Sequence, residues 1–276
     1  YPNSVALHKI QANVNVGLGL LDPAIKSYKA ASILEPNSAE IYYNLGVILQ
    51  NQGKLREAVD SYGKAVASDP SYADAFYNMG VSLQEQGKQE TAIEAYTKAL
   101  SFKPDCVNAF YNIAKAIRRL LFHKPNKALQ KTISVLLKQG KYVRPNDIAL
   151  AAISLLKVEP NLQKNLKLAN TEIIESLLDV ISDLNQFPLL LNLMKVCPLP
   201  DLELEKLFTN LRFAILSNIL NVQYSSPELL RLQSALALQC FTNEYIYNYT
   251  GEEEKILKSL DAKVRLDLSN NVQPTP

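Results

Sequence analysis

Apolar residues in the first half of the chain recur at helical spacing, in short blocks that come in pairs. Residues three and four apart share one face of a helix, so each block predicts an amphipathic helix. Gly53 stands between two blocks, where a helix can end in the left-handed conformation. Pro70 follows the second block and prevents its helix from continuing. The pattern predicts helix, turn, helix, with inward positions at Tyr42, Leu45, Leu49, Ala58, Tyr62 and Ala65.

This unit repeats at equal intervals, which the prolines mark at Pro2, Pro36, Pro70 and Pro104. A fixed period of this length, about 34 residues, indicates stacked structural repeats. Pro2 matches the end of a repeat whose body is missing, so the sequence predicts at least one further repeat upstream. A fourth unit begins at Val107 and loses register, which predicts a repeat-like helix pair with an insertion near residues 122–126. The regular copies span residues 5–38, 39–72 and 73–106.

The residues at the recurring positions resemble the tetratricopeptide repeat. Gly46, Gly53, Ala58, Tyr62 and Pro70 show the resemblance in the middle copy. It is specific over Val5–Cys106 and looser up to about Gly140. It implies an all-α fold, a right-handed superhelix (α-solenoid), in which the first helix of each repeat lines a concave face. We therefore expect a repeat domain over residues 1–141, truncated at its N-terminus.

From Tyr142 onward the period disappears while helical spacing continues, so residues 142–276 are predicted to form a helical region that caps the array. Several prolines stand just before the predicted helix starts. Thr171 and Asp201 are candidate N-caps. The tail, residues 270–276, is predicted to be disordered. The expected helices are Asp147–Val158, Thr171–Leu184, Leu202–Leu220, Pro227–Tyr245 and about Glu252–Leu266.

Two stretches of this second half, Pro188–Phe208 and Gln233–Glu254, resemble the linker of bacterial proteins that join tetratricopeptide repeats to an S-adenosylmethionine-dependent methyltransferase-like domain. In that arrangement the methyltransferase follows the helical region. The chain has no glycine-rich loop after a strand that would bind the cofactor. The resemblance implies a non-catalytic front part that recruits the substrate of such an enzyme.

The composition of the chain argues against several classes of function. The net charge is +2, which argues against a nucleic-acid binder driven by bulk charge. No apolar run is long enough to span a membrane. Three scattered cysteines and two histidines offer no metal or nucleophile pattern. We therefore expect no catalytic site, cofactor or metal in this chain, and a cytoplasmic location with reduced thiols.

The candidate site is the outward side of the first helices, about residues 39–52, 73–86 and 107–120. Asn44, Asn78 and Asn112 each carry an amide that can pair with the C=O and N–H of a peptide. Three amides at a regular rise predict a ladder that grips an extended backbone. A similar ladder lines the repeats of the O-linked N-acetylglucosamine transferase. The full candidate set is Tyr43, Asn44, Val47, Gln50, Tyr77, Asn78, Val81, Gln84, Tyr111, Asn112, Lys115 and Arg118.

Lys115, Arg118 and Arg119 make one end of this surface basic and could favour an acidic segment or a terminal carboxylate. Val47 and Val81 depart from the polar residues of chaperone-binding repeats. The leading interpretation is a protein-interaction module that binds an extended peptide or partner protein. Two alternatives stay open: the methyltransferase-recruiting part described above, and self-association through exposed repeat ends.

Overall fold

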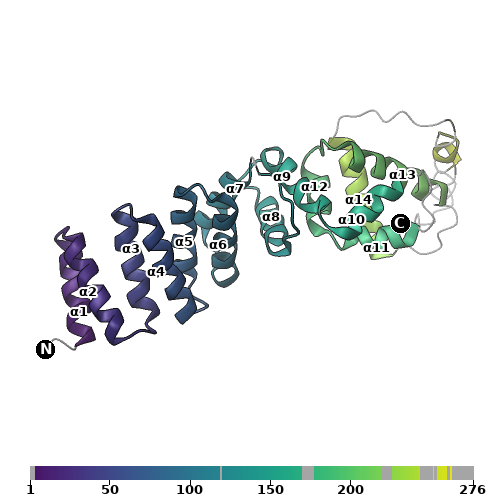
Figure 1. Cartoon of the computed structure of the whole chain (residues 1–276). Coiled ribbons are helices and arrows are strands. Elements are labelled where there is room, and N and C mark those ends of the chain that lie inside the picture. Colours follow the sequence, from purple (N-terminus) through teal and green to yellow (C-terminus); the bar gives the residue numbers. More distant parts are fainter. Residues whose placement is uncertain are drawn as a thin grey trace, which may run out of the picture. The chain divides into compact units, whose positions relative to one another are not determined.

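The computed structural model describes residues 4–118, 120–169, 177–218, 226–242, 251, 254–259 and 262 (Figure 1). Every regular element in these ranges is a helix. The chain divides into two compact units, Tyr1–Ile117 and Arg118–Pro276. The predicted all-α fold, an α-solenoid followed by a helical region, is confirmed.

The first unit is a series of antiparallel helix pairs that stand side by side (Figure 1). Within each pair the two helices pack closely, and the second helix also packs on the first helix of the next pair. This double contact gives every second helix two apolar neighbours, as stacked repeats require. The helices are α1 (Val5–Gly17), α2 (Leu21–Leu34), α3 (Ala39–Asn51), α4 (Leu55–Ser68), α5 (Ala73–Glu85), α6 (Gln89–Phe102) and α7 (Val107–Ile117).

Glycine forms the turn inside each pair. Gly19, Gly53 and Gly87 have φ angles of 73°, 75° and 79°. Residues with a Cβ are disfavoured in this left-handed region, which is why glycine recurs at the turn of each repeat. The turn predicted at Gly53 is confirmed.

A second glycine lies inside the first helix and touches the tyrosine of the paired helix. A Cβ added to Gly46 would lie 2.7 Å from Cε1 of Tyr62, and one added to Gly80 would lie 2.7 Å from Cδ1 of Tyr96. Both tyrosines are completely buried. The missing side chain of each glycine is therefore the space that a tyrosine ring occupies. In the first pair, Ala12 stands at the position that corresponds to Gly46.

Replacing Gly46 by valine should destabilise the first unit by about 1–3 kcal/mol, because the buried ring of Tyr62 has no room to move. Gly63 of α4 is the matched control, since a Cβ there meets nothing within 4 Å. Gly63→Val should change stability by less than about 0.5 kcal/mol. Urea unfolding followed by circular dichroism measures both. If both changes lower the stability equally, the contact between Gly46 and the ring of Tyr62 is not the cause.

The two units separate between Ile117 and Arg118, which differs from the division expected after residue 141. The expected fourth helix pair is split as a result. Its second helix, α8 (Lys127–Gln139), packs on helices α9 and α12 of the second unit. The predicted insertion is present as a non-helical segment over residues 120–126.

The second unit is built around α12. Its Leu189, Leu190, Leu191, Leu193 and Met194 are all buried, so the helix is apolar on nearly every side. Such a helix belongs in a core, and α12 packs against α8, α9, α11 and α14. Besides α8, the helices are α9 (Pro145–Lys157), α10 (Pro160–Ala169), α11 (Leu177–Asn185), α12 (Pro188–Val196), α13 (Leu202–Asn218) and α14 (Pro227–Thr242).

The sequence prediction identified α9, α11, α13 and α14 and missed α10 and α12. The two missed helices have only ten and nine residues, and each begins with a proline that the sequence pattern favoured as a boundary. Several predictions lie outside the described residues in whole or in part. They concern Pro2, the cap at Thr171, the ends of Thr171–Leu184, Leu202–Leu220 and Pro227–Tyr245, much of Glu252–Leu266, and the tail 270–276.

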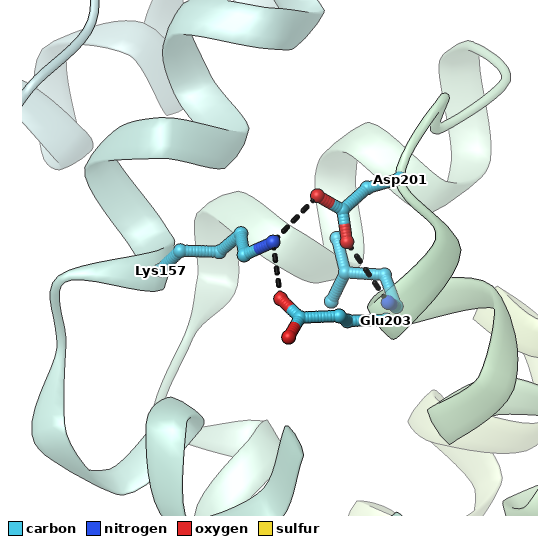
Figure 2. Close-up of polar contacts among 4 residues, drawn as sticks. Lys157, Asp201 and Glu203 are labelled. Atoms are coloured by element: carbon cyan, nitrogen blue, oxygen red, sulfur yellow. Dashed lines mark hydrogen bonds and ion pairs between the residues drawn. The ribbon is translucent and has the colours of Figure 1, made fainter. Parts of the chain in front are cut away.

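An ion-pair cluster joins the end of α9 to the start of α13 (Figure 2). Lys157 Nζ lies 2.8 Å from Asp201 Oδ2 and also contacts the carboxylate of Glu203. Burial alone lowers the pKa of Lys157, but its bonds to Asp201 and Glu203 outweigh this effect and raise the pKa. The other oxygen of Asp201 accepts a hydrogen bond from the backbone N–H of Leu204 at 3.0 Å. Asp201 is thus the predicted N-cap of α13 and an ion-pair partner at once.

These two roles of Asp201 can be separated by substitution. Asp201→Asn removes its charge and retains an oxygen that caps α13, whereas Asp201→Ala removes both. We expect the alanine variant to be about 1 kcal/mol less stable than the asparagine variant, which is the typical contribution of a cap. Urea unfolding of the helical signal gives the comparison. If the two variants unfold at the same urea concentration, the cap contributes nothing to the stability of the chain.

Candidate functional site

The candidate residues of α3, α5 and α7 lie at corresponding positions of successive repeats. We call the surface formed by Asn44, Asn78, Asn112 and their predicted neighbours on these helices the asparagine face. The three asparagines are half-buried, as are Val47, Val81, Gln50 and Gln84. The candidate set, predicted on the outward side of the first helices, is thus only partly exposed, because hydrogen bonds hold much of it in the junctions between helices.

Asn78 and Asn112 each donate a hydrogen bond to a tyrosine hydroxyl of the preceding repeat. Asn78 Nδ2 donates to the hydroxyl of Tyr43 at 3.1 Å, and Asn112 Nδ2 donates to that of Tyr96 at 3.2 Å. The amides of Asn112 and Asn44 also act on the hydroxyls of Tyr77 and Tyr28, where they lower the tyrosine pKa and partly offset the rise caused by burial. The asparagines therefore link each repeat to the one before it. In the described residues, the carbonyl oxygens of the Asn78 and Asn112 side chains accept no hydrogen bond.

The buried tyrosines of the second helices are satisfied within their own repeat. The Tyr62 hydroxyl donates to Gln50 Oε1 at 2.8 Å, and the Tyr96 hydroxyl donates to Gln84 Oε1 at the same distance. A buried hydroxyl without a partner would carry a large desolvation cost. The glutamines predicted as ligand-binding residues thus have a structural role.

The first repeat meets the same need with another residue. Valine replaces the glutamine at position 16, and the Tyr28 hydroxyl donates to Asn13 Oδ1 instead. Asn13 occupies the position of Val47 and Val81. Because positions 13 and 16 are three residues apart, they lie on the same helix face. The exchange preserves the hydrogen bond while moving the polar group by one turn.

The predicted tyrosines divide into two kinds. The ring of Tyr43 lies 6.0 Å from that of Tyr62 and 4.9 Å from that of Tyr72, and the ring of Tyr77 lies 5.7 Å from that of Tyr96. Tyr43 and Tyr77 are therefore half-buried parts of the packing. Tyr111 is 59% exposed, which leaves its ring available for contact with another molecule.

Of the predicted basic end of the face, Lys115 belongs to this unit, and Arg119 lies outside the described residues. Lys115 is exposed on α7. Arg118 belongs to the second unit, where its guanidinium lies 3.1 Å from Asp147 Oδ2. A pair between two partly exposed side chains is weak, but it gives Arg118 a partner other than a ligand carboxylate.

Burial raises the pKa of the tyrosines in this network. The effect is largest for Tyr62 and Tyr96, where burial is the first cause and the nearby hydroxyls of Tyr43 and Tyr77 add to it. The bond from Asn112 partly offsets the rise at Tyr96 by favouring the ionised hydroxyl. These hydroxyls therefore stay protonated well above the ordinary tyrosine pKa of 10.0.

Sequence reasoning missed the three buried tyrosines as partners of the face. The sequence pattern predicts Tyr62 only as an inward residue, and Tyr28 and Tyr96 occupy the same position in the neighbouring repeats. The sequence contains a signal for this role, since a tyrosine recurs once per repeat and a polar residue stands at a fixed place on the paired helix.

Among the described residues no group of three or more His, Cys, Asp or Glu side chains could hold a metal ion. None of the described helices is long and apolar enough to cross a membrane.

Comparison with known families identifies the repeats. The family described as "TPR repeat" matches residues 13–53 and 51–87, and "Tetratricopeptide repeat" matches residues 73–106. Residues 13–106 are therefore tetratricopeptide repeats. The matched residues include α2 to α6 and most of the asparagine face. Proteins with these repeats bind other proteins and peptides.

Solved structures with similarity to the chain include other repeat proteins. A crystal structure of MamA protein is 30% identical over 51% of this chain and 75% of that one, with a TM-score of 0.43. Another MamA structure is 28% identical over 59% and 82% of the two chains, with a TM-score of 0.42. The first tetratricopeptide domain of Spaghetti, solved with an HSP90 peptide, is 23% identical over 41% and 89%, with a TM-score of 0.40.

No curated protein matches the sequence. The family matches end at residue 106. The resemblance of Pro188–Phe208 and Gln233–Glu254 to a methyltransferase linker therefore stays a prediction.

The tyrosine network predicts a loss of stability at alkaline pH. In the unfolded chain tyrosines ionise near pH 10.0, whereas Tyr62 and Tyr96 keep their protons in the folded repeat. The folded state then binds more protons, so the stabilisation is complete below about pH 10 and decreases as the pH rises above it.

The variants Tyr62→Phe and Tyr96→Phe should each weaken this pH dependence. Urea unfolding between about pH 8 and about pH 11 measures the slope, and phenolate absorbance reports ionisation. Tyr111→Phe removes an exposed hydroxyl outside the network and is the control. A slope unchanged by Tyr62→Phe would show that the buried hydroxyls do not cause the alkaline loss.

Proposed function

We propose that the asparagine face binds an extended peptide segment of a partner protein through the segment's backbone. The observation that carries this proposal is which hydrogen-bonding groups of the asparagine side chains are already occupied and which remain available. The N–H groups of Asn78 and Asn112 are held by tyrosine hydroxyls. An amide has two N–H donors and one carbonyl acceptor. The acceptor therefore remains on each of these side chains, and a second donor remains on Asn78.

The tyrosine bonds make these amides better ligands than free side chains. Each bond fixes the orientation of the amide before a peptide arrives. Ordering a mobile side chain opposes binding, so an amide that is already held loses less entropy. The fixed repeat period places the amides at a regular rise, which suits a peptide in an extended conformation.

The side chains of the peptide would contribute less to recognition than its backbone does. Val47 and Val81 offer small apolar surface beside the amides, and Tyr111 offers an exposed ring. Lys115 is the positive charge at one end. Specificity for a terminal carboxylate is not part of the proposal, because Arg118 pairs with Asp147 in the second unit.

The test begins with partners captured by the whole chain. Overlapping peptides from a captured protein identify the segment that binds, and that peptide is titrated by fluorescence anisotropy. Asn78→Ala combined with Asn112→Ala should weaken the affinity about tenfold, since it removes two hydrogen-bonding groups that contribute about 0.5–1.5 kcal/mol each. Asn37→Ala with Asn146→Ala changes two exposed asparagines outside the asparagine face and should leave the affinity unchanged.

Two further measurements separate binding from folding. Tyr43→Phe keeps the Asn78 amide but removes the hydroxyl that holds it, so we expect an intermediate loss of affinity. Methylating backbone nitrogens of the peptide should weaken binding more than alanine replacements of its side chains. Wild-type affinity in a folded Asn78/Asn112 double variant would contradict the proposal.

A further inference from the structure

The second unit contains a cleft of about 560 Å³ that the asparagine face does not involve. One wall is a face of α8, and the other is formed by the starts of α10 and α12. Lys127, Lys131 and Lys138 line the α8 wall. Their spacing of four and seven residues places them on the same side of the helix.

The three lysines form an uncompensated positive surface. They are exposed, and none has an ion pair with any residue in the described part of the chain. The only acidic residue of the lining is Glu159, so the lining carries a net charge of +2, three lysines less one glutamate. Like charges four residues apart on a helix destabilise it. Keeping them together along a cleft favours a negatively charged occupant.

Glu159 does not neutralise the lysines. It is 6% exposed, and its Oε1 accepts a hydrogen bond from Gln130 Nε2 at 2.8 Å. This bond ties the start of α10 to α8 and holds the two walls of the cleft together. The carboxylate therefore has a structural partner, and the lysine ammonium groups remain available.

The cleft also has apolar surface. Half-buried Val135 lies between the lysines on α8, and the exposed rings of Pro160 and Pro188 lie on the opposite wall. A volume of this size is within the range of ligand pockets, about 300–1,000 Å³. A single small anion would leave most of it empty. The combination of lysines with aliphatic surface fits a short chain that alternates acidic and apolar side chains.

The lining favours a peptide over a nucleic acid. It contains no arginine for bidentate contacts to phosphate or guanine. Its one aromatic ring, Phe187, is 6% exposed and offers no platform on which bases could stack. We propose that this cleft binds an acidic peptide segment of a partner protein, with Lys127, Lys131 and Lys138 pairing to its carboxylates. The site is separate from the proposed asparagine face.

The probe for this proposal is a fluorescein-labelled octapeptide of alternating glutamate and leucine, titrated against the whole chain by anisotropy. The variant Lys131→Glu with Lys138→Glu should weaken binding at least about tenfold, because it replaces two attractions with two repulsions. Lys195→Glu with Lys206→Glu makes the same charge change on exposed lysines of α12 and α13 outside the cleft. It should change the affinity less than about threefold.

Several outcomes would overturn the proposal. They are no measurable binding by the wild-type chain, equal losses in the two lysine variants, or tighter binding of a short oligothymidine than of the peptide. Circular dichroism confirms that each variant is folded. The Asn78→Ala/Asn112→Ala variant should bind the acidic peptide like the wild type, so failure of one site is distinguishable from failure of the other.

Discussion

The repeat unit depends on the fit of a completely buried tyrosine against a helix that carries no side chain at the point of contact. Tyr62 and Tyr96 fill the spaces left by Gly46 and Gly80. Their hydroxyls cannot reach bulk water from this position, so each needs a polar partner on the facing helix. Gln50 and Gln84 supply it. In the second and third repeats, one steric constraint therefore determines the glycine, the tyrosine and the glutamine together.

Tyrosine hydroxyls also connect the core to the candidate binding surface. Asn112 of α7 donates to the Tyr96 hydroxyl, and Asn78 of α5 donates to that of Tyr43. The asparagines thus have a reason to recur in successive repeats even without a ligand, because they join one repeat to the next. Their recurrence alone does not identify a binding site. What distinguishes them is the carbonyl acceptor that each amide retains after the tyrosine bonds are made.

The sequence predicted the regular repeats well because the signals there are local and periodic. Gly53 marks its turn through a φ angle that other residues avoid. The hydrogen-bond network was harder to predict, since Asn78 and Tyr43 are far apart in the chain and belong to different repeats. The short helices α10 and α12 were missed because their periodicity spans less than three turns. The position of α10 is set by its packing on α9, α11 and α13, and that of α12 by its packing on α8, α9, α11 and α14, which no local pattern records.

The end of the regular array can be explained by the same constraint that builds it. Gln130 stands one repeat period after Tyr96. When the loss of register in the fourth unit is taken into account, Thr132 is the residue that corresponds to Tyr96. Neither side chain is an aromatic ring that could fill a space beside a facing helix. Gln130 bonds to Glu159 instead, and α8 packs on α9 and α12. Without a tyrosine ring at this position, α8 lacks the contact that holds the two helices of a regular repeat close together. The helix is then free to join a different core, and its lysine-bearing face is free to line a cleft there.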